Sequence, residues 1–407
     1  MSISLDRRNF IATGLTTTLC AATPAALAQK KYDPGVSDTE IVLGMPMPLS
    51  GPVSAYAVVG KVAEAYFKKL NDQGGINGRK VRVVIYDDQY SPPKTVEVAR
   101  RLVEQDQVFA IFSPLGSAPN AAILRYMNAR KVPHLFIHSG AGLFNDAAKN
   151  PWTVPLLASY QGEGRLFARH IIETKPDARI AMLMQNDDLG REVFKGLQEG
   201  LSKQTKARIV AQASFEVADP TIDSQIVQLK ASGADVLVMA ATSRTAAQAI
   251  RKTAEIGWTA ERYMSYAAAT SKMTFGPAGT ENSKGVIGLQ FNKDITSPRW
   301  NRDPEVLEYQ DLLKKYASDV DPSNSTGASG YIVAQLMAHV LREAGNELTR
   351  DNVRRLASNL KNPRIAMLLP GVKLENSPSD LFATASLQPV RFNGTDLDPI
   401  GPALSTK

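Results

Sequence analysis

Ser117 lies in a segment whose residue types and spacing suit either a nucleophile or an anion-binding hydroxyl. The segment SPLGSAPNAA, residues 113–122, follows the apolar run VFAIF and precedes a stretch of helical period. A strand, a tight turn with a small residue and a helix start form a nucleophile elbow, and the same arrangement binds anions at a helix N-terminus. The residues around Ser117 leave both interpretations open.

A serine hydrolase requires a base beside Ser117, and His138 is the candidate. His138 lies in FIHSGAG at the end of an expected strand, so it could approach Ser117 in a parallel sheet. Pro119, however, stands where the G-x-S-x-G elbow has its second glycine, so the tight packing of that motif is missing. A hydrolase using Ser117 and His138 is therefore the unfavoured alternative. The other histidines are His134, His170 and His339.

Motifs that bind nucleotides, dinucleotides or metals are incomplete in this chain. The glycine-rich stretch SGAG, residues 139–142, lacks a third glycine at the dinucleotide spacing, and no P-loop with Gly-Lys-Ser/Thr occurs. The acidic pairs at 87–88 and 187–188 have no histidine or further acid at ligand spacing. We expect these pairs to act as caps and turn residues, and we expect no cofactor, metal or catalytic residue.

Small residues follow two neighbouring apolar runs at the points where the expected strands end. In a doubly wound sheet, ligands bind beyond this edge because backbone amides and helix N-termini point there. Ser117 would act there as a hydroxyl donor and a helix cap, with no base required. The set consists of Ser113, Gly116, Ser117, Gly140, Ala141 and Gly142.

Apolar runs alternate with segments of helical period from residue 39 onward, which predicts parallel sheets with helices on both faces. Strands are expected at 41–49, 80–87, 108–112 and 132–137, with helices at 55–71, 93–105 and 118–130. After residue 155 the alternation restarts, with helices at 162–173, 190–203, 222–232 and 243–256 and strands at 178–184, 207–215, 234–240 and 261–266. The fold class is therefore α/β with two lobes of similar size.

The last third of the chain returns to a lobe that is already formed. After an apolar run at 284–291 it contains three expected helices, at 303–317, 327–344 and 349–360, without strands between them. These helices cannot form a sheet domain of their own, so they must cover one of the two lobes. The chain then crosses between lobes several times, as in a hinge around a cleft.

The composition is that of an ordinary globular protein. The 407 residues are 43% hydrophobic and 21% charged, and the formal net charge is +7. Lysines and arginines are scattered among acidic residues and form no basic stripe, which argues against nucleic-acid binding.

Residues 1–28 are expected to be an export signal. Arg7 and Arg8 precede a run of apolar and small residues that ends at Ala28, the pattern of a twin-arginine signal. Cys20, the single cysteine, lies in this segment, so the mature chain has no thiol; a lipid anchor at Cys20 is the alternative. No later apolar run reaches the length of a membrane span, so we expect a soluble periplasmic protein.

Two long stretches carry a resemblance to a known family. They are GPVSAYAVVGKVAEAYFKKLNDQGGINGRKVRVVIYDDQYSPPKTVEVARRLVEQDQVFAIFSPLGSAPNAA, residues 51–122, and DPTIDSQIVQLKASGADVLVMAATSRTAAQAIRKTAEIGW, residues 219–258. This pattern resembles the leucine/isoleucine/valine-binding type of periplasmic solute receptor, the substrate-binding subunit of an ABC importer. The likeness extends from about residue 39 to the last strands.

The resemblance implies two Rossmann-like lobes, three crossovers and a ligand clamped by closure. Lobe one would comprise residues 38–157 and 288–372, and lobe two residues 158–287 and 373–407. It also implies a monomer that delivers its ligand to an ABC permease of the inner membrane.

The resemblance implies a set of ligand contacts in lobe one. The family's carboxylate-holding serine matches Ser117, its strand-end backbone donors match Gly140 and Gly142, and its first-loop aromatic matches Tyr56.

The sequence departs from the family's amino-acid receptors at Gly142 in lobe one and at several positions in lobe two. The threonine beside the carboxylate is Gly142, and two cleft tyrosines fall on Leu189 and Thr242. The acid that pairs with a ligand's ammonium falls near Ala267, with Tyr266 adjacent. Because an unpaired buried ammonium is costly, this departure argues against an amino acid.

We therefore expect a small aromatic or aliphatic carboxylate as the ligand, with a branched-chain or other amino acid as the alternative. Ser117 and backbone amides would hold the carboxylate, and Tyr56, Leu189, Tyr160 and Tyr266 would cover the rest. A sensor that presents its closed form to a signalling protein remains a second hypothesis, because the sequence does not separate sensing from transport.

Overall fold

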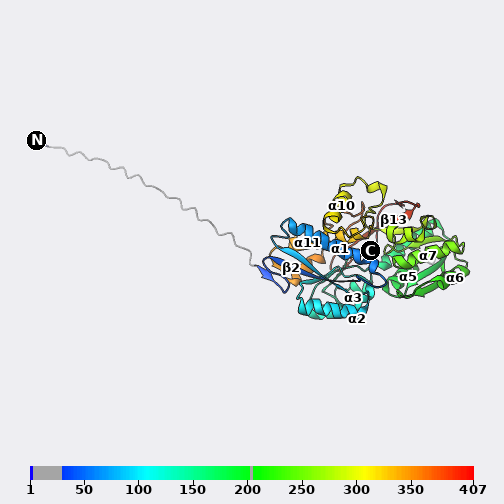
Figure 1. Cartoon of the computed structure of the whole chain (residues 1–407), viewed down its shortest axis with the longest axis horizontal. Helices are drawn as coiled ribbons and strands as arrows, with labels where there is room; N and C mark the ends of the chain where they lie inside the picture. Colours follow the sequence, from blue (N-terminus) through cyan, green and yellow to red (C-terminus); the bar gives the residue numbers. More distant parts are fainter. Residues whose placement is uncertain (3–29, 202–204) are drawn as a thin grey trace.

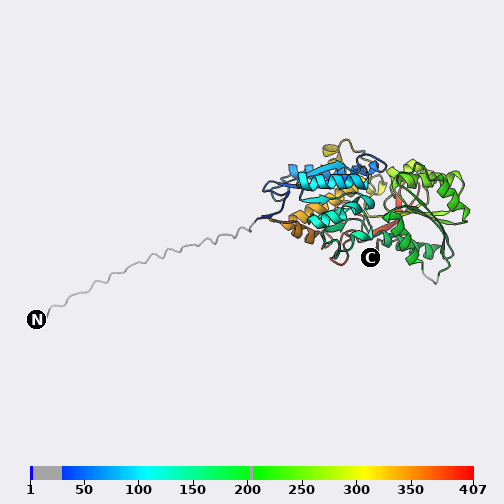
Figure 2. The same cartoon turned by 90° about the horizontal axis from the view of Figure 1, so that it is seen from below.

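A computed structural model describes residues 1–2, 30–201 and 205–407 of the chain. It has two α/β lobes side by side along the long axis of the molecule (Figures 1 and 2). The expected signal segment, with Arg7, Arg8, Cys20 and Ala28, lies outside the described residues. The prediction of a two-lobed α/β fold is confirmed.

Lobe one is built on a five-stranded parallel sheet of order β3-β2-β4-β5-β6. The first strand in the chain, β2, lies inside the sheet, with β3 on one side and β4 on the other. The order of strands therefore reverses at β2 and β4, and a doubly wound sheet binds ligands beside such a reversal. The bounds are β2 Glu40–Met47, β3 Lys80–Asp87, β4 Ala110–Phe112, β5 His134–Ile137 and β6 Thr153–Pro155.

Helices cover both faces of this sheet. On one face α1 (Ala57–Asp72) packs against α11 (Gly327–Ala344) and α10 (Pro304–Tyr316), and α12 (Arg350–Ala357) adjoins α11. The other face carries α2 (Pro92–Arg100) and α3 (Ser117–Arg130), whose apolar sides form a smaller core with Val42 and Ile111. The helix expected at 93–105 is α-helical as far as Arg100 and continues as a π-helix over Arg101–Gln105.

Lobe two has a larger mixed sheet of order β14-β13-β11-β10-β9-β7-β8. Here β7 lies between β8 and β9, so a second reversal lies at the ends of β7 and β9. Strands β13 and β14 run antiparallel to their neighbours, and β15 pairs with β13. The bounds are β7 Arg179–Gln185, β8 Arg208–Phe215, β9 Val236–Ala240, β10 Glu261–Met264, β11 Ile287–Gln290, β13 Ser386–Phe392, β14 Leu397–Pro399 and β15 Leu404–Ser405.

The helices of lobe two lie in two pairs. One pair is α4 (Tyr160–Thr174) with α5 (Asp188–Gly200), and the other is α6 (Asp223–Ala231) with α7 (Ser243–Glu255). Alanines and aliphatic residues of α6 and α7 form a core with β9 and the C-terminal strands. Figure 2 shows those C-terminal strands, in red, among the green elements of lobe two.

The chain passes between the lobes after β6, after β11 and again before β13. From the sequence, the second segment of lobe one was expected to begin at residue 288. Because β11 pairs with β10 and β13 in the sheet of lobe two, the chain leaves lobe two only after Gln290. A short parallel pair, β1 (Lys31–Tyr32) with β12 (Glu347–Leu348), fastens the N-terminal segment to lobe one.

Glu163 on α4 is a buried acid that positions the loop after β10. Its carboxylate accepts hydrogen bonds from the Tyr266 amide at 2.7 Å and the Ser265 hydroxyl at 3.0 Å. Its side chain is fully buried, and burial raises the pKa of Glu163 to about 8, with these two hydrogen bonds opposing the shift. The folded protein therefore holds a proton on Glu163 that the unfolded chain releases near pH 4.5.

The substitution Glu163→Gln is expected to flatten the dependence of stability on pH. Since the folded pKa is raised, the free energy of unfolding of the native protein falls as pH rises from about 4.5 to 8, and glutamine has no proton to lose. At pH 8 the free energy of unfolding of the variant, measured with denaturant, should be higher than that of the native protein by on the order of 2–4 kcal/mol. At pH 5 the two free energies should be nearly equal.

The matched control is Glu173→Gln, an exposed acid on the same helix, whose pH profile should parallel that of the native protein. A Glu163→Gln profile with the native slope would contradict a protonated Glu163.

Candidate ligand-binding cleft

A cavity lies between the lobes where both strand-order reversals face each other. It holds about 930 Å³ of empty space, part of it continuous with solvent. Residues following β2, β4, β7 and β9 line it. Residues of the first two crossings, after β6 and after β11, complete the wall. The lining comprises Val53, Tyr56, Val59, Tyr90, Leu115, Gly116, Ser117, His138, Leu157, Tyr160, Leu189, Thr242, Tyr266, Ala267, Ala269, Thr270, Gln290, Phe291, Asn292, Ser325, Thr326 and Ser329.

Ser117 is the first residue of α3, and its hydroxyl lies 2.7 Å from the hydroxyl of Ser139. The expectation that Ser117 caps its own helix is wrong, because Gly116 is the N-cap and no side chain bonds the helix start. In the described part of the chain, the amide N–H groups of Ser117 and Ala118 have no acceptor. The start of α3 therefore offers a hydroxyl, two free amides and the positive end of a helix dipole.

Gly116 is required by the close approach of Tyr90. Its φ is +93°, and a Cβ at this position would lie 2.2 Å from a carbon of the Tyr90 ring. Tyr90 itself has φ +58° in the loop after β3, which brings its phenol beside the start of α3. Burial, followed by the nearby Asp187 charge, raises the pKa of this phenol well above its usual value. The sequence analysis missed Tyr90, whose backbone conformation has no signal in the sequence.

His138 lines the cavity but forms no pair with Ser117. The partner of the Ser117 hydroxyl is Ser139, and Nε2 of His138 has no hydrogen-bond partner among the described residues. Burial lowers the pKa of His138 to about 3, so its imidazole is neutral at ordinary pH. The nucleophile and base of the hydrolase hypothesis are therefore not assembled.

Tyr160 and Tyr266 form a stacked pair over Gly140. Their ring centres are 5.8 Å apart with planes inclined by 24°, and the Tyr266 hydroxyl donates to the Ala158 carbonyl at 2.7 Å. A Cβ on Gly140 would lie 2.6 Å from that hydroxyl and 2.9 Å from Tyr160, so only glycine fits beneath the pair. The two rings thus separate Gly140 from the cavity that it was expected to line.

The phenol oxygen of Tyr160 faces the donors that were expected to hold a carboxylate. Burial raises the pKa of Tyr160, and the charge of Asp187 adds to the rise. Hydrogen bonds from the Gly140 amide and from the hydroxyls of Ser139 and Ser117 act against it. The phenol of Tyr160 therefore keeps its proton, and it lies near the Gly140 amide and the Ser139 and Ser117 hydroxyls.

Ala141 and Gly142 lie outside the cavity wall. Ala141 is fully buried, and its amide donates to the Ser139 hydroxyl at 3.2 Å. The Gly142 amide donates across the cleft to both carboxylate oxygens of Glu192 on α5, at 2.8 and 2.9 Å. Burial raises the pKa of Glu192 to about 7. The Gly142 amide, expected to bind a ligand, links the two lobes in this structure.

Tyr56 also links the lobes. Its hydroxyl donates to the Ala267 carbonyl at 2.8 Å and accepts from the Ser243 amide at 3.1 Å, with the Ser243 hydroxyl 3.0 Å away. Tyr56 belongs to lobe one, whereas both partners belong to lobe two. Tyr56, the predicted aromatic contact, therefore joins the lobes through its hydroxyl and is also one of the residues that line the cavity.

Leu189 and Thr242 line the lobe-two side, where they were expected. Asp187 caps α5 by accepting from the Leu189 and Gly190 amides, which directs Leu189 to the cleft. The Thr242 hydroxyl donates to the Gln185 side chain at 3.3 Å. The predictions that 87–88 and 187–188 serve as caps and turn residues agree with the backbone amides bonded by Asp87, Asp88 and Asp187.

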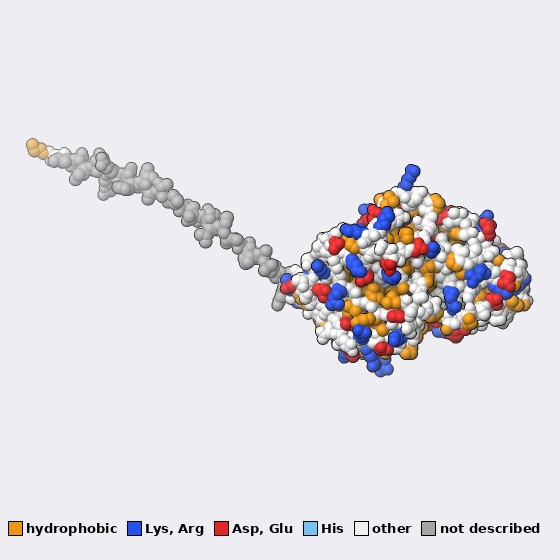
Figure 3. All heavy atoms as spheres, viewed as in Figure 1, with side chains coloured by type: hydrophobic (Ala, Val, Ile, Leu, Met, Phe, Trp, Pro, Cys, Tyr) orange, Lys and Arg blue, Asp and Glu red, His pale blue; other side chains and the backbone are white. Residues whose placement is uncertain are grey.

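The cavity wall carries no charged side chain, since Asp, Glu, Lys and Arg are absent from the lining residues. In the described ranges no cluster of three or more His, Cys, Asp or Glu could hold a metal ion. On the outer surface, basic and acidic side chains are interspersed on the face seen in Figure 3. No helix within the described residues is long and apolar enough to cross a membrane.

Comparisons with known proteins agree with this architecture. The chain is 23% identical over 334 residues to Leu/Ile/Val-binding protein homolog 1 of Brucella suis biovar 1 (strain 1330). The match covers 77% of this chain and 81% of that protein.

Among solved structures, a branched-chain amino acid ABC transporter protein from Thermus thermophilus with bound valine superposes with a TM-score of 0.80 at 15% identity. The superposition covers 91% of this chain and 97% of the Thermus thermophilus chain. A fatty acid ABC transporter substrate-binding protein from Thermomonospora curvata superposes at 0.77 and 19% identity, covering 92% and 95%. At these identities the superpositions establish the fold.

The family follows from the sequence match itself. Residues 40–376, most of the chain, match the family described as Periplasmic binding protein. Its relatives bind solutes and are not enzymes, so the hydrolase hypothesis is wrong. This two-lobed chain, with its uncharged cavity between the lobes, belongs to the periplasmic binding protein family and is similar to Leu/Ile/Val-binding members of it.

Proposed function

We propose that the protein is the substrate-binding subunit of an ABC importer and that its ligand is a small organic carboxylate without an ammonium group. The observation that carries the proposal is the uncharged cavity with the free N-terminus of α3 at one end. An aromatic or aliphatic acid fits this combination better than an amino acid does.

The carboxylate would lie at the start of α3. Its oxygens would accept from the Ser117 hydroxyl and from the free amides of Ser117 and Ala118, where the helix dipole favours negative charge. Tyr160 would donate its proton to the same carboxylate while it accepts from Gly140 and Ser139. The Gly140 amide would then act on the ligand through Tyr160 and not by direct contact.

An ammonium group finds no counterpart in the cavity. Ala267 stands where an acid was expected. Two buried acids near the cavity are already engaged, because Glu163 accepts from Ser265 and Tyr266 and Asp187 accepts from Gln185 and the Leu189 amide. Burying an ammonium without a carboxylate costs several kcal/mol, more than a small side chain recovers by its own burial. This supports a deaminated ligand.

Transport would follow from closure of the lobes on the ligand. A ligand shifts the population of closed protein only by its difference in affinity for the closed and open states. A carboxylate held by lobe one and covered by Leu189, Thr242 and Tyr266 of lobe two makes this difference large. The closed form would then deliver the ligand, from a monomer, to a permease in the inner membrane.

Export to the periplasm by the twin-arginine route is part of the proposal. It rests on Arg7, Arg8 and the apolar run that ends at Ala28. A reporter fused after residue 28 should be exported, and Arg7→Lys with Arg8→Lys should abolish its export. Continued export of the double variant would contradict this route.

The substitution Ser117→Ala is expected to weaken ligand binding by roughly 10–100-fold, because it removes one hydrogen bond to a charged group. Residues 29–407 are first screened by thermal shift against amino acids, aliphatic acids and aromatic acids, since a ligand at 100 times its Kd stabilises by about 2.7 kcal/mol. Calorimetry with the best acid then compares the variants.

The matched control is Ser224→Ala, an exposed serine on α6 that should bind as the native protein does. Equal affinity in Ser117→Ala would place the carboxylate elsewhere, and stabilisation by amino acids alone would contradict the proposed ligand class.

The substitution Tyr56→Phe is expected to open the lobes, because phenylalanine cannot bond the Ala267 carbonyl or the Ser243 amide. In X-ray solution scattering the ligand-free variant should have a larger radius of gyration than the native protein, and its affinity for the ligand should fall about tenfold. Tyr126→Phe removes a phenol bonded to Glu104 away from the cleft and serves as the control. An unchanged radius and affinity would show that Tyr56 does not hold the lobes together.

A further inference from the structure

The end of the cavity near the second crossing carries a set of polar side chains that the α3 site does not use. Ser329 comes from the first turn of α11 in lobe one, and Thr270 comes from the loop after β10 in lobe two. Asn292, on the crossing itself, lies between these elements. Three segments distant in sequence thus meet at this end, which we call the hinge end.

Two hydroxyls at the hinge end lack partners in the described structure. They are Oγ of Ser329 and Oγ1 of Thr270, both of which are shielded from solvent. Ser329 as a whole is 7% exposed. A buried hydroxyl without a partner costs about 1–3 kcal/mol, and most buried polar groups in proteins have partners. Both side chains line the cavity, one from each lobe, and a turn about χ1 would bring either hydroxyl to a bound molecule that supplies the missing hydrogen bond.

The hydroxyl and amide N–H groups of the neighbouring side chains are already engaged. The Ser325 hydroxyl donates to Asp294, and the Thr326 hydroxyl donates to the sulfur of Met273. The side-chain amide of Asn292 donates to the carbonyls of Lys293 and Ser325, and that of Gln290 donates to the Ala269 carbonyl. Ser329 and Thr270 are therefore the hydroxyls left over for a ligand.

The group that these hydroxyls suit is neutral. No charged side chain lines the cavity, and Asp294 behind it is taken up by Ser271, Thr296 and Ser325. A second carboxylate or an ammonium at the hinge end would meet no side chain of opposite charge, and the first amides of α11 already bond the carbonyls of Asn324, Ser325 and Thr326. A hydroxyl or a carbonyl oxygen, in contrast, can exchange hydrogen bonds with both side chains.

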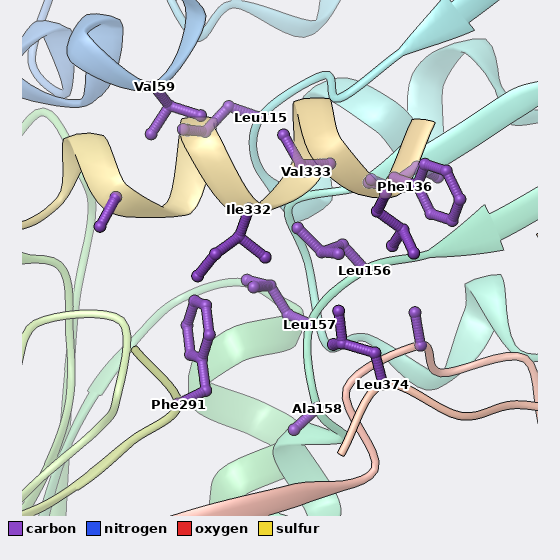
Figure 4. Close-up of a cluster of buried hydrophobic side chains, with 14 of the residues drawn as sticks. Val59, Leu115, Phe136, Leu156, Leu157, Ala158, Phe291, Ile332, Val333 and Leu374 are labelled. Carbon is purple, nitrogen blue, oxygen red and sulfur yellow. The ribbon is translucent and has the colours of Figure 1, made fainter. Parts of the chain in front are cut away.

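The wall between the two ends is apolar. In Figure 4 Ile332 of α11 points toward Leu157 and Phe291, and Val59 and Leu115 lie on the other side of that helix. Except for Ile332, these residues line the cavity, and Ile332 is fully buried behind them. A molecule that reaches both ends would therefore pass an apolar body, ring or chain, through this middle part.

We propose that the ligand carries a neutral hydrogen-bonding group, a hydroxyl or a carbonyl, at the end opposite its carboxylate, and that Ser329 and Thr270 bind this group. The inference rests on the proposed function for the position of the carboxylate. It deepens that function from a small carboxylate to an acid with a hydroxyl or keto group at its far end. Because Ser329 and Thr270 belong to different lobes, binding of this group favours the closed state.

The test compares acids that differ only in the far group. One pair is 3-phenylpropanoate and 3-(4-hydroxyphenyl)propanoate, and the other is hexanoate and 6-hydroxyhexanoate, so both ring and chain are covered. Calorimetry on residues 29–407 should find, in at least one pair, that the hydroxylated acid binds about tenfold more tightly. The double variant Ser329→Ala with Thr270→Val should reduce this ratio to near one.

The control is Ser117→Ala, which should weaken both members of a pair and leave their ratio unchanged. A second readout is thermal unfolding without ligand, where removal of two unpartnered hydroxyls should leave Tm unchanged or raise it.

Three outcomes would overturn the inference while the proposed function stands: a ratio near one in the native protein for pairs that bind, a ratio that survives in the double variant, or a clear fall in its ligand-free Tm. If all four acids fail to bind while leucine binds, the proposed ligand class itself is wrong, and the inference fails with it.

Discussion

A solute that enters this cleft meets no side chain of opposite charge. The lining residues are aromatic, aliphatic, hydroxyl-bearing or amide-bearing, and the start of α3 adds two free amides at the positive end of a helix. A helix N-terminus compensates an anion and does nothing for a cation. This asymmetry separates a carboxylate, which can be desolvated here, from an ammonium, whose burial would cost several kcal/mol. The ligand class, its orientation and the neutral character of its far end all depend on this constraint.

The polar atoms around the cavity divide into those that join the lobes and those that remain for a ligand. The hydroxyl of Tyr56 and the amide of Gly142 bond to lobe two, so closure itself satisfies them. The start of α3 and the hydroxyl of Ser329 remain unsatisfied. Contacts of the first kind join the two lobes, whereas those of the second kind provide the differential affinity that makes closure respond to a ligand.

Local patterns in the sequence identified the two lobes, most helices and the place of Ser117, because hydrophobic period and strand ends are local properties. The family resemblance, and not a local pattern, suggested Leu189 and Thr242 as cleft residues, and both follow strands beside the reversal of strand order. What the sequence could not provide was contact between distant residues. The stacking of Tyr160 on Tyr266 covers Gly140, and the reach of Glu192 across the cleft occupies Gly142. Tyr90 reaches the site only through a left-handed backbone, and β11 joins lobe two through pairing with β13.

The central claim is that the cleft accepts a carboxylate and rejects an ammonium. The most direct measurement is calorimetric titration of residues 29–407 with leucine and with 4-methylpentanoate, which is leucine without its amino group. The account predicts that 4-methylpentanoate binds at least tenfold more tightly than leucine. Equal or tighter binding of leucine would contradict the account, because it would require an acidic partner that the lining of the cavity does not contain.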